Sequence, residues 1–245
     1  MSVKPFFVNT SFSFAFELKA DIQDFANVIG SYLINEYEAA QLNNVPPNTD
    51  PSVPRVAFTA KDGMSQIVLS QVNMALNIGF PVEIREDSEK VMARIIDQVD
   101  YLKDIVEELC LVMQFSGIMN FAKINLTGEV SSTEAIKNLA AKLSKSTDVN
   151  NLYDLEYKTT KVVENTYYSN VSIKNYKSFP KEVFEKFKGR VPNGEITEYG
   201  IDVLIDFNDR FVFNENSAYS TTVESWDILI KESFKKLETE ISILN

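Results

Sequence analysis

The chain of 245 residues contains no histidine, one cysteine and eight glycines. Histidine is the usual base near neutral pH and a favoured ligand of zinc, copper and iron. Its absence excludes Ser-His-Asp and Cys-His hydrolases, two-histidine zinc proteases and facial-triad iron enzymes built within this chain. The glycines are scattered and form neither GxGxxG nor GxxxxGK[ST], so we do not expect nucleotide binding by those folds, and no cofactor is predicted.

The single cysteine, Cys110, rules out a disulfide framework within the chain. It falls at the end of an expected apolar helix with no Lys or Arg close beside it, so we interpret it as a buried structural thiol. The longest nearly apolar stretch, 109–121, is interrupted by Gln114 and Ser116, and no membrane span is expected. The N-terminus shows no secretory signal pattern, and we expect a cytoplasmic protein.

Basic residues are fewer than acidic ones, 24 against 35, which gives a formal net charge of −11. Such a charge repels phosphate backbones and favours association with a basic protein partner. The segment 157–190 is the exception, with eight basic and three acidic residues and several aromatic rings. Cations interleaved with aromatic rings can follow a single nucleic-acid strand and stack its bases. The candidate contact residues are Lys158, Lys161, Tyr167, Tyr168, Lys174, Tyr176 and Lys177.

An alternative explanation of this segment is structural, because lysines protect exposed strand edges and tyrosines suit half-buried strands. We favour that explanation.

Carboxylates cluster in the segment 201–210, where Asp202 and Asp206 would lie on one face of a strand, two pleats apart. With Asn208 and Asp209 they suggest a site for Mg²⁺ or Mn²⁺. The alternative is the solvent face of a half-buried strand followed by a turn, and we favour it.

Hydrophobic periodicity indicates the same order of elements twice. In the first half, alternation over 6–18 predicts a strand, and Asp21 caps a helix reaching about Ala40. Asp62-Gly63 forms a hairpin turn between a strand-like run at Val56 and Phe58 and a strand over 72–80. Ser88 then caps a long helix.

In the second half, a strand over 115–126 precedes a helix with the capping box Ser131 and Glu134. A strand-like region over 157–176, a small helix over 180–188, an Asn193-Gly194 turn and a strand over 201–207 follow. Thr221 with Glu224 caps the last helix.

These patterns predict an α+β fold of two strand-helix-strand-strand-helix units with a mainly antiparallel sheet, and the repeated order suggests a pseudo-duplication. The units would span 1–113 and 114–245 and pack as one globular body. Because the repeat is one of element order without residue identities, an unduplicated α+β chain is the alternative.

Short segments also resemble a sporadically distributed family of uncharacterised bacterial proteins of about 250 residues. The segments are Val53-Pro54-Arg55, Asp62-Gly63, Leu69-Ser70, the helix through Asp100 and Leu109, Lys123-Ile124-Asn125, 201–207 and the closing helix. Where such proteins commonly have an Arg-rich strand, this chain has Phe121-Ala122-Lys123. The resemblance implies no activity and no site residues, and it suggests an accessory gene of variable genome regions.

We therefore predict a non-enzymatic protein that binds a protein partner through a sheet face or edge, as an accessory or inhibitory factor in a bacterial or phage conflict system. The alternatives are a single-stranded nucleic-acid or nucleotide binder that uses the segment 157–190, and a carboxylate-metal enzyme centred on Asp202 and Asp206. Exposed strand edges would also permit a homodimer.

Overall fold

The computed structural model describes residues 4–46, 48–143, 152–186, 188 and 195–244. The first half of the chain contributes, in order, β1 (Pro5–Phe16), α1 (Ile22–Leu33), β2 (Gln41–Leu42), β3 (Val56–Thr59), β4 (Ser65–Leu69), β5 (Asn73–Gly79), the 3₁₀-helix η1 (Val82–Ile84) and α2 (Ser88–Glu108). The second half contributes β6 (Met113–Asn125), α3 (Ser132–Leu143), β7 (Glu156–Val163), β8 (Tyr167–Ser178), α4 (Lys181–Lys186), β9 (Glu198–Asn208), α5 (Arg210–Glu215) and α6 (Val223–Leu244).

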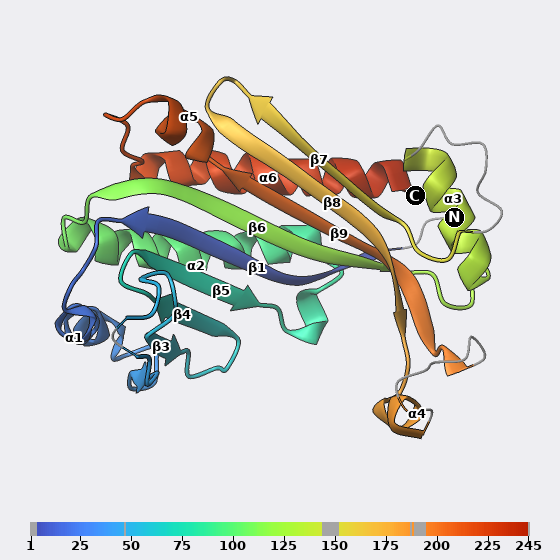
Figure 1. Cartoon of the computed structure of the whole chain (residues 1–245), viewed down its shortest axis with the longest axis horizontal. Helices are drawn as coiled ribbons and strands as arrows, with labels where there is room; N and C mark the ends of the chain where they lie inside the picture. Colours follow the sequence, from blue (N-terminus) through green and yellow to red (C-terminus); the bar gives the residue numbers. More distant parts are fainter. Residues whose placement is uncertain (1–3, 47, 144–151, 187, 189–194, 245) are drawn as a thin grey trace.

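The described strands form one nine-stranded sheet in the order β2-β3-β4-β5-β1-β6-β9-β8-β7, and every pairing is antiparallel (Figure 1). The predicted α+β class with an antiparallel sheet is confirmed. β1 and β6 pair at the centre, where Ser11 lies opposite Met119. On either side of this pair the order is the same: β3, β4, β5 and β1 in the first half correspond to β7, β8, β9 and β6 in the second.

The first half contains two strands more than its sequence pattern predicts, the short β2 and β4, and the second half contains one more. In the first half, β4 pairs with both β3 and β5, so the Asp62-Gly63 turn is followed by two strands. In the second half, the region 157–176 is a hairpin of β7 and β8. In the turn of this hairpin, Glu164 and Asn165 have positive φ values of 53° and 51°. Glycine is the residue that usually marks such a turn in a sequence, and neither position has one.

The ends of the helices correct several predictions. Asp21 caps α1 as predicted, but the helix ends at Leu33, before Ala40. The cap of α2 is Asp87, whose carboxylate accepts from the Lys90 amide at 3.1 Å, so the prediction of Ser88 was wrong by one residue. Ser131 caps α3 as expected, accepting from the Glu134 amide at 3.2 Å. The predicted turn at 193–194 lies outside the described residues.

The predicted cap of the last helix and the predicted burial of Cys110 also differ in the structure. Thr221 precedes α6, which begins at Val223, and its hydroxyl bonds with Ser116 and Ser225. Cys110 is exposed, so the prediction of a buried thiol was wrong. The reason is that α2 ends at Glu108 and Cys110 turns away from the helix at φ 48°.

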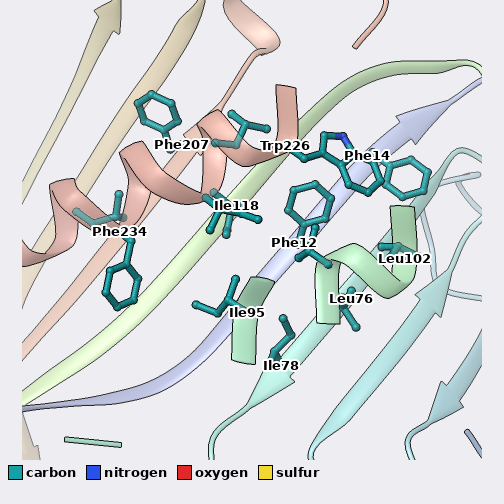
Figure 2. Close-up of a cluster of buried hydrophobic side chains, with 14 of the residues drawn as sticks. Phe12, Phe14, Leu76, Ile78, Ile95, Leu102, Ile118, Phe207, Trp226 and Phe234 are labelled. Carbon is teal, nitrogen blue, oxygen red and sulfur yellow. The ribbon is translucent and has the colours of Figure 1, made fainter. Parts of the chain in front are cut away.

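The core lies between one face of the sheet and the helices α2 and α6 (Figure 2). Trp226 of α6 packs on Phe12 and Phe14 of β1, with ring centroids 4.6 and 5.3 Å apart. Phe234, two turns later, stacks on Phe7 at 5.3 Å. Burial of each such ring stabilises the fold by about 1.5–3 kcal/mol, and these contacts join the last helix to the first strand.

Both long helices lie behind the sheet in Figure 1, so the picture looks onto the opposite face. We call this the uncovered face, since no long helix of the described ranges lies on it. The short helix α5 packs on one end of it, where Phe211 contacts Tyr168 of β8 with ring centroids 5.4 Å apart. It carries the alternate side chains of each strand, which are more polar than those of the core.

Candidate functional site

A row of side chains, all polar except Met119, crosses the uncovered face from β3 to β7. The strand registers place one residue of each strand opposite the next, so the row is continuous over eight strands. Its members are, in spatial order, Thr59, Gln66, Asn77, Ser11, Met119, Asp206, Asn170 and Thr160.

Hydrogen bonds fix the conformation of this row on both sides of Met119. The Ser11 hydroxyl donates to Asn77 Oδ1 at 2.8 Å. On the other side, Asn170 Nδ2 donates to Asp206 Oδ2 at 3.0 Å and Thr160 Oγ1 donates to Asn170 Oδ1 at 2.8 Å. Side chains held in this way lose little further conformational entropy when a partner docks.

An apolar centre interrupts the polar row. Met119 is 39% exposed. Two positions on, Phe121 lies on the same face and pairs with Leu204 of β9, and both are half-buried. Two positions before Met119, Gly117 leaves room for Asn208 of β9. A Cβ atom at position 117 would lie only 2.7 Å from the Cβ of Asn208. The result is a small apolar area surrounded by ordered amides and hydroxyls.

Asp202 lies further along the uncovered face, between its cross-strand neighbours Lys123 and Lys174. It is only 8% exposed, and its Oδ1 has no hydrogen-bond partner among the described residues. The Lys174 ammonium lies 3.9 Å from its Oδ2. Burial raises the pKa of the Asp202 carboxyl, and the charges of Lys123 and Lys174 partly oppose that rise.

The lysines and tyrosines proposed as nucleic-acid contacts do not form one surface. Tyr167 is buried and stacks on Phe207 at 5.1 Å, so it is a core residue and cannot stack on a base. Tyr168 and Tyr176 share the uncovered face of β8, but eight residues separate them, or about 27 Å. Bases of one strand could not bridge that distance by continuous stacking.

The lysines of this set are divided between the two faces and the edge strand. Lys158 and Lys161 are exposed on β7, where Lys158 pairs with Glu156 at 2.9 Å. Lys174 and Lys177 lie on opposite faces of β8, and Lys177 lies 3.4 Å over the Tyr153 ring. The arrangement is typical of a protected sheet edge.

Asp202 and Asp206 lie on one face, as predicted for a metal site. They are four residues apart on the strand, about 13 Å. Asp206 accepts hydrogen bonds from the amides of Asn170 and Asn208. Within the described ranges, no group of three or more His, Cys, Asp or Glu is placed to hold a metal ion.

Asp209, the third carboxylate of the segment, belongs to a buried network that the sequence did not predict. Its Oδ1 accepts from the Ser116 amide at 2.7 Å, and its Oδ2 accepts from the Tyr219 hydroxyl at 2.9 Å and the Ser116 hydroxyl at 3.2 Å. Burial, together with the charge of Asp209, raises the pKa of Tyr219. The network joins β6 to the connection between β9 and α6, and its role is structural.

Neither protein-family models nor curated proteins match this chain. The resemblance to bacterial proteins of about 250 residues stays a prediction. In the part of the chain that the structure describes, no helix combines the length and the apolarity that a membrane crossing requires.

Proposed function

We propose that this chain is a non-enzymatic binding protein whose uncovered sheet face docks a protein partner. The observation that carries the proposal is the ordered polar row around the apolar side chains of Met119, Phe121 and Leu204. Interfaces between proteins have this composition, an apolar centre within a polar rim that supplies hydrogen bonds.

The width of the face favours a macromolecule over a small ligand. Small molecules are held in concave sites, whereas the row extends over eight neighbouring strands. At about 4.8 Å between strands it is on the order of 34 Å long, which suits an interface of about 800 Å² on each partner. An inhibitory or accessory role in a bacterial or phage conflict system is part of the proposal.

A comparison of variants tests the proposal. The wild-type protein, Met119→Arg and Ile228→Arg would be immobilised and used to capture proteins from the source cells. Ile228 is an exposed apolar residue of α6, on the helical side of the sheet, and serves as the matched control. We expect one stoichiometric partner on the wild type and on Ile228→Arg, and its loss on Met119→Arg. Equal capture by all three would refute the role of the uncovered face.

A further inference from the structure

α2 ends and β6 begins at the end of the molecule where α1 lies (Figure 1). Several apolar side chains of these segments are exposed there. Leu18, Val28 and Val112 are 59%, 47% and 68% exposed. Val28 and Val112 line a hollow of about 340 Å³ together with Phe25, Leu109 and Leu111, and Leu18 follows the lining residue Glu17 in the chain. We call this hollow the α1–α2 groove. It is separate from the uncovered face and takes no part in the function proposed above.

The charges beside the α1–α2 groove are unfavourable in the free protein. α2 ends with Glu107 and Glu108 and has no basic residue in its last turn. A helix carries partial negative charge at its C-terminus and is stabilised there by cations, so two glutamates oppose it. Glu17 adds a third carboxylate, against one ammonium, that of Lys19. None of the three glutamates has an ion-pair partner among the described residues.

In the second half of the chain, a lysine balances the partial negative charge at the C-terminus of the long helix α6. α3 and α6 occupy there the positions of α1 and α2, and they enclose a hollow of about 350 Å³ lined by apolar residues such as Leu139 and Leu244. Lys142 of α3 donates to the main-chain carbonyl of Leu244, at the end of α6. α1 has no basic residue in its last turn, so it provides no cation equivalent to Lys142.

From these observations we propose that the α1–α2 groove binds a basic, amphipathic segment of a partner protein. Apolar side chains of that segment fill the groove beside Val28, Leu111 and Val112. A lysine or arginine of the segment faces the C-terminus of α2, as Lys142 faces the C-terminus of α6 in the second half. Amphipathic segments bind apolar grooves in this way, and the charges orient them.

A second copy of this chain is a less suitable occupant. Self-association through this end would bring Glu17, Glu107 and Glu108 of each copy together, and the whole chain has a net charge of −11. A basic segment removes the unfavourable charge at the end of α2, whereas a second copy doubles it.

The test uses two helical model peptides, one of leucine and lysine and one of leucine and glutamate. Cys110 lies in the groove, is exposed and is the chain's only cysteine, so its rate of alkylation in the full-length protein reports occupancy. We expect the lysine peptide to bind saturably and to slow alkylation of Cys110. The glutamate peptide should do neither. Failure of the lysine peptide to bind, or equal binding of the two, would overturn the proposal.

Two variants and one control locate the binding. Val28→Asn/Val112→Asn, which removes apolar contacts without adding charge, should weaken binding of the lysine peptide about tenfold or more. Ile243→Asn, on the exposed side of α6, should leave it unchanged. Glu107→Lys/Glu108→Lys should also weaken it while raising the melting temperature of the free protein, since cations suit a helix C-terminus. A merely damaged fold would lower that temperature instead.

Three results would contradict the proposal: equal peptide affinity in the wild type and both groove variants, loss of affinity in Ile243→Asn as well, or a wild-type dimer that Val28→Asn/Val112→Asn dissociates. The last would assign the groove to a second copy. Because the peptides are tested on purified protein, the outcome does not depend on whether the uncovered face binds its own partner.

Discussion

Replacement of Asp209 by alanine should destabilise the fold strongly. The Asp209 side chain is fully buried and accepts three hydrogen bonds, from the amide and hydroxyl of Ser116 and from the hydroxyl of Tyr219. Without it, the Ser116 hydroxyl can still bond with Thr221 at 2.9 Å, but the Ser116 amide loses its acceptor. A buried donor left without a partner costs about 1–3 kcal/mol, and Asp209→Ala removes the acceptor of two donors that have no other acceptor among the described residues, the Ser116 amide and the Tyr219 hydroxyl.

We therefore expect Asp209→Ala to lower the free energy of unfolding by about 2–6 kcal/mol. Urea unfolding monitored by circular dichroism measures this as a lower midpoint with an unchanged slope. Asp206→Ala is the matched control, since Asp206 also accepts two amide hydrogen bonds but is half-exposed, and its loss should cost about 1 kcal/mol.

Tyr219→Phe should cost about 1 kcal/mol alone and almost nothing in the Asp209→Ala background, because the two side chains share one interaction. If Asp209→Ala were no more destabilising than Asp206→Ala, the assignment of Asp209 as the centre of a buried network would be wrong.

Three further predictions concern single positions. Because burial raises the pKa of Asp202, the folded state binds more protons than the unfolded state just above pH 4, and the free energy of unfolding should fall as the pH rises through that range. Asp202→Asn should reduce this pH dependence and raise the free energy of unfolding at pH 7. Urea titrations at several pH values would measure both effects. Gly200→Ala should cost about 1–3 kcal/mol in urea unfolding, because a Cβ there would lie 2.0 Å from the Ile124 carbonyl oxygen, and an unchanged midpoint would contradict the close approach of β6 and β9. Cys110 should react with a thiol reagent in native buffer as fast as in urea, and slow native labelling would contradict its exposure.

Much of the fold followed from local patterns. The strand β1, the long helices α2 and α6, and the cap at Asp21 each have a periodicity or a capping residue that a single sequence reveals. The α+β class followed from the order of these elements. β4 and the β7–β8 turn were missed because the first is short and the second has no glycine.

The candidate site was harder to predict, because it depends on contacts between distant segments. Ser11 and Asn77 are 66 residues apart, and Ser116 and Asp209 are 93 apart. Neither pair leaves a local signal. The charged segment 157–190 was conspicuous in the sequence, yet strand alternation sends its side chains to both faces of β8 and buries Tyr167.

The most direct test of the uncovered face is methionine oxidation in the free and partner-bound protein. Met119 at the centre of that face and Met64 in the turn between β3 and β4 are 39% and 40% exposed, so peroxide should oxidise them at similar rates in the free protein. With the captured partner bound, we expect mass spectrometry to show Met119 protected and Met64 oxidised as before. Equal oxidation of Met119 in both states would contradict docking on the uncovered face.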